Sequence, residues 1–422
     1  MTAPSHRPID YAHHFPWTRL FRALRIATDP RKLILAALAL TALWGGEQLL
    51  SMLPFAPAEA QHVLPPWDAV SPIMLVGDGE EASWFFDLPR EHSHTLAARV
   101  LTPVRPLLDV LGLTFGSAQS WPTIAWVWTR LFWSLAVWSL FGGAIARLAA
   151  VEFARDERIG LGQAFRFSAA RFPSLFAAPL LPIAAILGLW GINALGGLLG
   201  RIPLVGDWVV AIAWGIAVVV ALLIVLITIA TAIGWPLMVA AVATENSDAF
   251  DGFSRSFSFV YSRPWLGLWY VAAALLLGIA CAALVDTLAV GVVSAAARTV
   301  ASGMGERSVA GLQIATPGYF TDVSAAMPDT DVVGFPGMLM AVWLSAIAMV
   351  AIGFAASYFW TATTIVYFLL RRADDATHFD EVWLGETDEE DDLLPLAGIA
   401  STDQPVTERS HHPTVDPPIT TA

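Results

Sequence analysis

Six long apolar stretches constrain this chain more than any other feature of its sequence. The hydrocarbon core of a bilayer is about 30 Å thick and an α-helix rises about 1.5 Å per residue, so one crossing needs about 20 apolar residues. Only 14% of the 422 residues are charged, against about a quarter in soluble domains. We therefore predict an all-α, polytopic helical membrane protein with about six spans. The stretches are residues 33–54, 123–150, 174–197, 207–233, 265–290 and 337–370.

The fourth stretch is ambiguous in length. Its apolar sequence continues through Gly234, Trp235 and Pro236 to Thr244, which is nearly enough for two helices. Two crossings would need a polar turn between them, and none is present. Because proline removes a helical hydrogen bond, we predict one span that is broken at Pro236.

The first stretch could also be a secretory signal, because Ala58, Glu59 and Ala60 resemble a cleavage site between small residues. However, about thirty residues precede the apolar core, and the apolar stretch is long enough to span a bilayer. We predict an uncleaved signal anchor.

Basic residues predict the orientation of the spans. Segments rich in Arg and Lys face the cytoplasm, whereas the segments at 55–122, 198–206 and 291–336 hold few of them and are predicted to be exterior. Both ends of the chain are then cytoplasmic, and we expect the bacterial cytoplasmic (inner) membrane as the location. The basic residues on the cytoplasmic side are Arg7, Arg19, Arg22, Arg25, Arg31, Lys32, Arg155, Arg158, Arg166, Arg171, Arg255, Arg263, Arg371 and Arg372.

A short pattern recurs before each odd-numbered span. It is an aromatic, arginine-bearing amphipathic stretch that ends at a proline: LFRALRIATDPRKL at 20–33, AFRFSAARFPSL at 164–175 and GFSRSFSFVYSRPWL at 252–266. Proline ends one helix and fits the first turn of the next, so each stretch can turn from the membrane surface into a span. We call these stretches elbows and predict three repeats, each an elbow followed by a hairpin of two spans.

The predicted organisation has three parts. Residues 1–32 form a cytoplasmic segment with the first elbow, and residues 33–370 form a six-span domain with exterior loops at 55–122 and 291–336. Residues 371–422 form an acidic, largely disordered cytoplasmic tail, because carboxylates and prolines dominate there.

Part of the sequence resembles a known family. The segments at 243–270 (ATENSDAFDGFSRSFSFVYSRPWLGLWY) and 152–176 (EFARDERIGLGQAFRFSAARFPSLF) are similar to elbow segments of bacterial multi-pass proteins related to the membrane domain of glycerophosphodiester phosphodiesterases. The ending at 363–384 (TTIVYFLLRRADDATHFDEVWL) resembles the last span and tail of uncharacterised membrane proteins of planctomycete type. The soluble phosphodiesterase barrel is missing, so the resemblance implies an architecture and no catalytic residue.

Catalytic and metal-binding motifs do not stand out. The sequence has no HExxH, GxSxG or GxxxxGK[ST] pattern, and its single cysteine is Cys281. His92 and His94, with Asp87 and Glu91, could approach a metal, but a solvated loop is the better interpretation because no complete ligand set is visible. We therefore predict no metal, no cofactor and no nucleic-acid binding, and we favour a protein that is not an enzyme.

Polar residues recur at one depth inside the spans, in the exterior third. This candidate polar layer contains Glu47, Gln48, Arg130, Asn193 and Asp286. It could line an entrance for a substrate or ion. The simpler interpretation is that Glu47 and Arg130 form an ion pair that holds the first hairpin together, while Asn193, Asp207 and Asp286 lie in the wet interface.

Three function classes remain, of which a membrane enzyme with an unfamiliar site is the weakest. We favour a noncatalytic structural or interaction component of the membrane. A small-solute or lipid-related transporter is the alternative, because Pro179 and Pro182 in the third span and Pro236 in the fourth could interrupt helices, as in transporter sites. An exterior segment at 95–115, broken by Pro103 and Pro106, could lie flat on the membrane as an amphipathic element.

The partner we expect is the lipid bilayer. The acidic tail is the place where a soluble protein could bind, and the simpler interpretation is a solvated charged segment without a partner. One short element in the tail, at 379–384, carries Phe379 and Trp383 among carboxylates. It could bind another protein or the chain's own elbows, through Arg22, Arg166 and Arg255.

Overall fold

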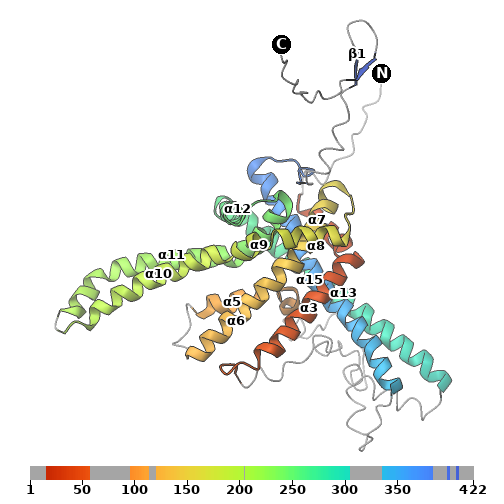
Figure 1. The fold of residues 1–422 in the computed structure, drawn as a ribbon, viewed down its shortest axis with the longest axis horizontal. Coiled ribbons are helices and arrows are strands. Elements are labelled where there is room, and N and C mark those ends of the chain that lie inside the picture. Colours follow the sequence, from red (N-terminus) through yellow and green to blue (C-terminus); the bar gives the residue numbers. More distant parts are fainter. Residues whose placement is uncertain are drawn as a thin grey trace, which may run out of the picture. The chain divides into compact units, whose positions relative to one another are not determined.

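The computed structural model describes residues 16–57, 96–113, 120–203, 205–304, 335–383, 397–399 and 405–407. By its contacts the chain divides into two units, Met1–Glu381 and Val382–Ala422. The described part of the second unit is two short antiparallel strands, β1 (Ala397–Ile399) and β2 (Pro405–Thr407), with Gly398 opposite Val406. The first unit contains the membrane-spanning helices (Figure 1).

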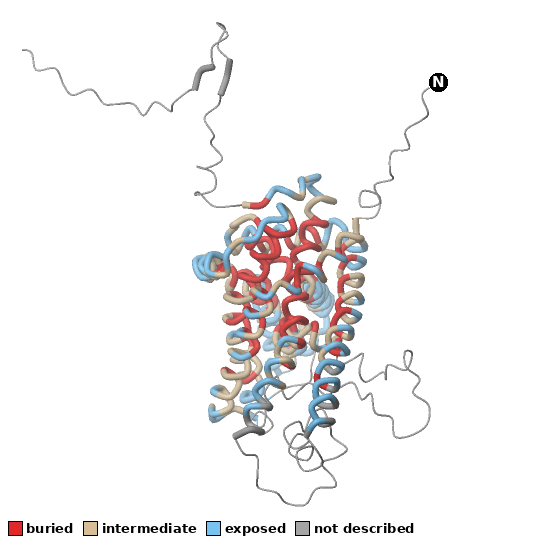
Figure 2. Tube along the Cα trace, turned by 90° about the vertical axis from the view of Figure 1, so that its right-hand side faces the viewer, coloured by how far each residue is buried: buried red, intermediate tan, exposed pale blue. Residues whose placement is uncertain are grey.

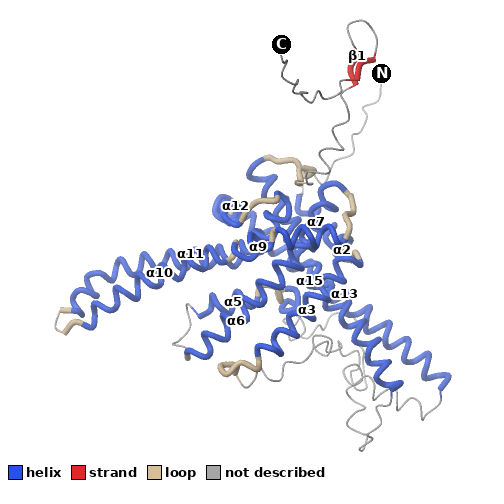
Figure 3. The backbone as a smooth tube through the Cα atoms, in the orientation of Figure 1, coloured by secondary structure: helices blue, strands red, loops and turns tan. Residues whose placement is uncertain are grey.

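In the described part of the chain, six helices are long and apolar enough to cross a membrane, which confirms the predicted all-α polytopic fold. Consecutive spans run side by side as hairpins, as α10 beside α11 and α13 beside α15 show most clearly (Figures 1 and 3). The helices are α3 (Pro30–Leu50), α6 (Trp121–Val137) continued by η3 (Trp138–Gly142) and α7 (Gly143–Arg155), α10 (Leu180–Leu198), α11 (Gly206–Glu245), α13 (Pro264–Met304) and α15 (Phe335–Asp375).

The prediction that the fourth span breaks at Pro236 is wrong. Helix α11 is continuous over 40 residues and contains Pro236. Proline removes one hydrogen bond but does not end the helix here, because the surrounding turn is held by packing: Trp235, Leu237 and Met238 are each at most 2% exposed. Helix α13 continues to Met304, so it extends into the segment that we predict as an exterior loop from residue 291.

The elbows form as the prolines predict. Elbow 1 contains η1 (Pro16–Phe21) and α2 (Arg22–Ala27), and Pro30 then opens α3, where the Asp29 side chain caps the first turn. Elbow 3 is α12 (Ala249–Ser262), and Pro264 is the first residue of α13.

Elbow 2 is longer than the other two elbows. Helix α8 (Leu161–Ala170) is followed by the short helix α9 (Phe172–Ala177), whose second residue is Pro173, before α10 begins. At the far end of the second hairpin, the turn η4 (Leu199–Arg201) connects α10 towards α11. The same sequence pattern therefore gives a direct entry into spans 1 and 5 and an extra helical turn before span 3.

A π-helical turn, η3, interrupts span 2. In such a turn the backbone hydrogen bonds run between residues five apart, one more than in an α-helix. Here the Ser168 hydroxyl of elbow 2 donates to the Ser139 carbonyl at 2.7 Å. A Cβ atom on Gly142 would lie 2.6 Å from the Trp360 ring, and one on Gly143 would lie 2.5 Å from Ser168 Oγ. The glycine pair therefore allows span 6 and elbow 2 to approach the same point of span 2.

The even-numbered spans meet around three tryptophans. The ring centroid of Trp360 lies 5.8 Å from those of both Trp138 and Trp235, and all three side chains are buried. Spans 2, 4 and 6 thereby share one aromatic core, which no single hairpin could form.

Burial is uneven along the spans. In Figure 2 the buried residues gather in the upper part of the helical body, and exposed residues predominate toward its lower end. In α11, for example, Met238, Ala241 and Val242 are fully buried, whereas Ile212 is 82% exposed and Trp208 72% exposed. The exposed apolar half suits contact with lipid tails, and the buried half contains the protein core.

Candidate functional site

The predicted ion pair between Glu47 and Arg130 is confirmed. Arg130 Nη2 donates to Glu47 Oε1 at 2.9 Å, and Arg130 Nε reaches the same oxygen at 3.2 Å. Asp109 adds a second carboxylate, 3.6 Å from Arg130 Nη1. The pair joins α3 of span 1 to α6 of span 2, and Asp109 brings in helix α5 (Arg105–Leu113) from the segment between them.

The other polar residues have separate partners. Asp286 of α13 accepts a bond from Arg99 Nη1 at 2.6 Å, and Asn193 of α10 donates to the Ala217 carbonyl of α11 at 3.3 Å. Gln48 follows Glu47 on α3, and its backbone carbonyl accepts from the Ser51 hydroxyl at the end of the same helix. Three contacts of the candidate polar layer therefore join different pairs of segments, namely Glu47 with Arg130, Asp286 with Arg99 and Asn193 with Ala217, whereas the Gln48 contact stays within its own segment.

The segment 96–113 is built into the helical body, although it was predicted to lie in an exterior loop. Its amphipathic pattern is present, and the apolar side packs on α6, α13 and α15 with six residues at most 5% exposed. The buried residues are Leu96, Val100, Val104, Leu107, Val110 and Leu111. Arg99 and Asp109 attach the segment through ion pairs with Asp286 and Arg130. The missed signal in the sequence was the spacing of three to four residues between the buried apolar positions 96, 100, 104, 107 and 111, which is the period of an amphipathic helix.

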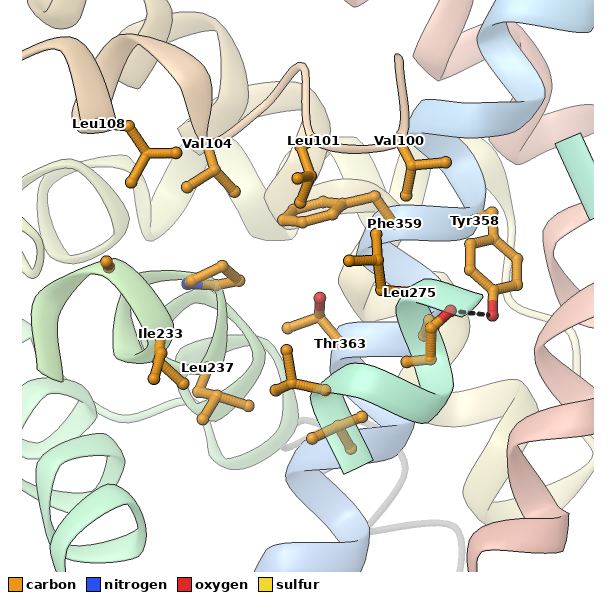
Figure 4. Close-up of a pocket in the computed structure, with 16 residues that line it drawn as sticks. Val100, Leu101, Val104, Leu108, Ile233, Leu237, Leu275, Tyr358, Phe359 and Thr363 are labelled. Carbon is orange, nitrogen blue, oxygen red and sulfur yellow. Dashed lines mark hydrogen bonds between the residues drawn. The ribbon is translucent and has the colours of Figure 1, made fainter. Parts of the chain in front are cut away.

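An apolar cavity of about 210 Å³ lies between this segment and helices α11, α13 and α15. Figure 4 shows Leu101 and Val104 on one side, Ile233 and Leu237 on another, and Leu275 and Thr363 between them. The Tyr358 hydroxyl, also in the wall, donates to the Ala274 carbonyl at 2.9 Å. The walls expose almost only hydrocarbon, so this space does not resemble the polar entrance that the candidate layer suggested.

A second ion pair joins the same two spans at their opposite ends. Lys32, the only lysine in the sequence, places Nζ 2.5 Å from Glu152 Oε2 of α7, and it also donates to the Ile26 carbonyl at 3.0 Å. Both side chains are at most 6% exposed. Asp29 lies 4.0 Å from Lys32 Nζ, and Arg158 lies 3.8 Å from Glu152. In the sequence, Lys32 indicates only the orientation of span 1.

Arg147 is a further charge that the sequence analysis missed. It lies within span 2, is 4% exposed, and donates to the Ala243 carbonyl of α11 at 3.0 Å. Its guanidinium also lies 4.8 Å from the centre of the Phe167 ring in elbow 2. A charge inside an apolar span was the available signal.

The three repeats end in the same backbone conformation. In the described residues, positive φ outside glycine occurs at Asp156, Asn246 and Ala376, with φ of 56–57°. Each of these residues directly follows an even-numbered span, at α7, α11 or α15. This left-handed residue terminates a helix and is tolerated best by glycine, Asn and Asp.

An arginine from each elbow contacts the end of its own hairpin. Elbow 1 supplies Arg22 and Arg25, which lie 2.6 and 3.1 Å from Asp156 Oδ1. In elbow 2, Arg171 Nε donates to Asn246 Oδ1 at 2.5 Å. After elbow 3, Arg263 Nε lies 3.8 Å from Asp374 Oδ1. We call these contacts the elbow clamps. In repeats 1 and 2 the partner is the left-handed residue itself, and in repeat 3 it is Asp374, two residues before the left-handed Ala376. The recurrence of an arginine from each elbow at the end of its hairpin supports the three-repeat prediction.

Elbow 3 is also attached to span 4. The Tyr261 hydroxyl donates to the Leu226 carbonyl of α11 at 3.1 Å. Burial raises the pKa of Tyr261 above its ordinary value of 10.0, which further favours the protonated hydroxyl that donates this bond.

A network around Glu245 joins repeats 2 and 3. The Tyr367 hydroxyl donates to Glu245 Oε1 at 2.6 Å, and Arg255 and Arg371 lie 2.9 and 3.1 Å from the carboxylate. Arg371 also donates to the Glu381 carbonyl at 2.8 Å. One carboxylate at the end of span 4 therefore binds elbow 3 and the end of span 6.

The start of the tail contacts the helical body. This agrees with the prediction that Phe379 and Trp383 belong to an element that could bind the chain's own elbows. Phe379 packs edge-on against Phe153 at 5.9 Å, and Arg19 and Arg372 lie 3.9 and 4.7 Å from its ring centre. Arg22 lies over Phe153 and not over Phe379. Elbow 1 thus receives the tail, but through Arg19, which the sequence analysis did not name for this role.

The loop that carries Asp87, Glu91, His92 and His94, which we interpret as solvated and not as a metal site, lies outside the described residues. Within the described ranges, no group of three or more His, Cys, Asp or Glu side chains is arranged to hold a metal ion.

These features define a multi-pass α-helical membrane protein, whose six apolar helices are long enough to cross a bilayer. Comparisons with protein-family models, with curated proteins and with solved structures found no match to the chain. The resemblance to the membrane domain of glycerophosphodiester phosphodiesterases and to planctomycete-type proteins therefore stays a prediction.

Proposed function

We propose that this chain is a noncatalytic structural or interaction component of the bacterial cytoplasmic membrane, with both of its ends in the cytoplasm. The pairing of charges in the spans carries the proposal: Arg130 contacts Glu47 and Asp109, and Arg99 contacts Asp286. A charge at the centre of a span costs about 3 kcal/mol on insertion scales and is commonly paired. Partners from the same chain give these charges a structural role that requires no ligand.

Accessibility of the candidate polar layer tests this role. Cys281 is replaced by Ser, and a single cysteine is placed at Gln48 in protein reconstituted into vesicles. An impermeant thiol reagent should modify that cysteine from one side of the membrane only, under every ionic condition. Modification from both sides would mean that position 48 becomes accessible in turn to the two sides of the membrane. That result contradicts a static role and favours transport.

Orientation is tested separately in intact cells. The arginine distribution predicts that cysteines at Ser93 and Ala310 are exterior, and that cysteines at Ala169, Asp248 and Ser401 are cytoplasmic. An impermeant reagent should therefore label the first two and leave the other three unlabelled. Labelling at position 401 without labelling at position 93 reverses the proposed orientation.

A lipid-related transporter is the second candidate, because the cavity between α11, α13 and α15 is apolar and adjoins the exposed hairpin surfaces. Transport requires that this space be reached in turn from the two leaflets. The accessibility experiment distinguishes the two candidates, since only the transporter needs a second state.

We also propose that the acidic tail beyond the docked Phe379 is the contact site for a soluble partner. Glu386 and the carboxylates at 388–392 give this segment a dense negative charge, which favours a basic surface on the partner. Removing the residues after Leu384 should abolish binding of such a partner while leaving the thiol accessibility of the spans unchanged.

A further inference from the structure

We propose that the cavity between segment 96–113 and helices α11, α13 and α15 is a binding site for one hydrocarbon chain of a membrane lipid. This inference does not depend on whether the protein is a static component or a transporter. The chemistry of the walls is its first support. Most of the lining side chains are apolar, such as Leu101, Ile233 and Leu275, and the walls expose few polar atoms. Such walls offer dispersion contacts to a hydrocarbon and little to a polar solute.

The depth of the cavity is the second support. Wall residue Val271 lies about 10 Å along α13 from the start of that helix, and Pro236 and Val366 lie about 14 Å from the ends of α11 and α15, at 1.5 Å per residue. Tyr358 lies about 26 Å from the end of α15 by the same rise. These positions are within a hydrocarbon layer about 30 Å thick, where acyl chains are the available apolar molecules.

Size and rigidity are the third support. A dry apolar cavity of about 150 Å³ already takes up benzene, and this one measures about 210 Å³ and is partly open. The wall formed by segment 96–113 is held at two places, by Arg99 with Asp286 and by Asp109 with Arg130. Those ion pairs oppose collapse of the wall, so an unfilled space would leave its lining without contacts.

The wall on α11 also has a fixed shape. Pro236 has no N–H group, so it cannot bond the Ala232 carbonyl one turn earlier, and both residues line the cavity. In the described structure Thr363, on the facing helix α15, makes no side-chain hydrogen bond and is only partly buried. Ala232 and Thr363 are therefore positions where a larger side chain can enter the space of the proposed chain.

The test uses the full-length protein in lipid nanodiscs that contain phosphatidylcholine with a photoactivatable diazirine midway along one acyl chain. After irradiation, the labelled peptides are mapped by mass spectrometry. We expect label on the cavity wall at 358–366 as well as on the lipid-facing surface of α11. In Ala232→Phe and Thr363→Leu, label on the wall should be lost while label on the α11 surface remains. Ala221→Phe is the matched control, on the exposed face of the same helix, and should keep both.

Two outcomes would overturn the proposal. One is that the wall at 358–366 of the wild-type protein stays unlabelled while the α11 surface is labelled. This result is obtained without any variant, so it does not depend on whether the variants fold. The other is wall label that neither filling variant reduces. A parallel sample carries the diazirine on a free fatty acid in unlabelled phospholipid. Wall label from the phospholipid identifies a bilayer lipid as the source of the chain, and wall label from the fatty acid alone identifies a free chain. Either source supports the hydrocarbon site, and neither result depends on the thiol-accessibility experiment.

Discussion

The two ion pairs that join span 1 to span 2 differ in burial, although they connect the same two helical spans. Lys32 and Glu152 have side chains that are 1% and 6% exposed, whereas Glu47 and Arg130 are 26% and 28% exposed. The first pair lies where the elbows, the aromatic core and the ends of the even-numbered spans pack together. The second lies away from that packed end, beside helix α5 of segment 96–113, which supplies Asp109.

Because the two ion pairs differ in burial, the free-energy cost of removing one partner should also differ between them. A buried charge that loses its partner keeps its desolvation penalty, so removing one partner is far more damaging than removing both. A half-exposed charge can be hydrated after its partner is lost, so its removal costs less. The Lys32 pair should therefore control folding, and the Glu47 pair should adjust the geometry of the first hairpin.

The largest effect is predicted for Lys32→Met. It leaves Glu152 buried with only the exposed Arg158 nearby, and we expect a loss of about 3 kcal/mol in the free energy of unfolding. Lys32→Met combined with Glu152→Met should recover most of that loss, because both charges are then absent. Unfolding in a mild detergent, followed by circular dichroism, measures both variants. A double variant that is as unstable as the single one would show that Glu152 acts through another partner.

A smaller effect is predicted for the second pair. Glu47→Gln and Arg130→Gln should each cost about 1 kcal/mol, since the groups are partly exposed. The charge swap Glu47→Arg with Arg130→Glu should recover only part of the loss, because residue 130 would then face Asp109. A double-mutant cycle in the same detergent assay quantifies the coupling. Absence of coupling would remove the contrast between the two pairs by making both residues independent.

The spans, the elbows and the Glu47–Arg130 pair were predictable from sequence because each depends on local pattern. The length of an apolar stretch predicts a span, and a proline after an amphipathic stretch predicts an elbow. The equal depth of Glu47 and Arg130 in their spans predicts that the two form an ion pair. Segment 96–113 could not be placed, because its two prolines and exterior position resemble a surface loop. Its burial depends on helices α13 and α15, more than 150 residues away in the sequence. The cavity could not be predicted from the sequence for the same reason, because its walls come from four distant parts of the chain.

Continuity of α11 through Pro236 shows a second limit of local patterns. The proline correctly indicates a missing hydrogen bond. Whether the helix ends there depends on packing by Trp235 and Met238, which only the assembled core provides.

The elbow clamps give a third prediction, which tests whether the deeply packed end is built from equivalent repeats. Asn246 occupies in repeat 2 the left-handed position that Asp156 occupies in repeat 1. Asp156→Asn should therefore change stability little, because Asn accepts from arginine and adopts this conformation readily. Asp156→Ala should cost about 1 kcal/mol, chiefly from the strained backbone. The detergent assay compares the two variants, and equal losses would mean that the charge of Asp156, and not its conformation, is what the repeat requires.

The smallest effect is predicted for the tail, and it tests how far the packed end extends. Phe379 contacts Phe153 and lies beneath Arg19 and Arg372, and such cation–π contacts contribute about 0.5–1 kcal/mol each at exposed sites. Truncation after Arg372 and the point variant Phe379→Ala should both lower the detergent melting temperature, the truncation more so because it also removes Asp374 from its contact with Arg263. Truncation after Leu384 should leave the melting temperature unchanged, because it keeps Phe379 and Glu381. If the two truncations destabilise equally, the distal tail contributes to the fold, and the boundary of the packed end lies beyond Glu381.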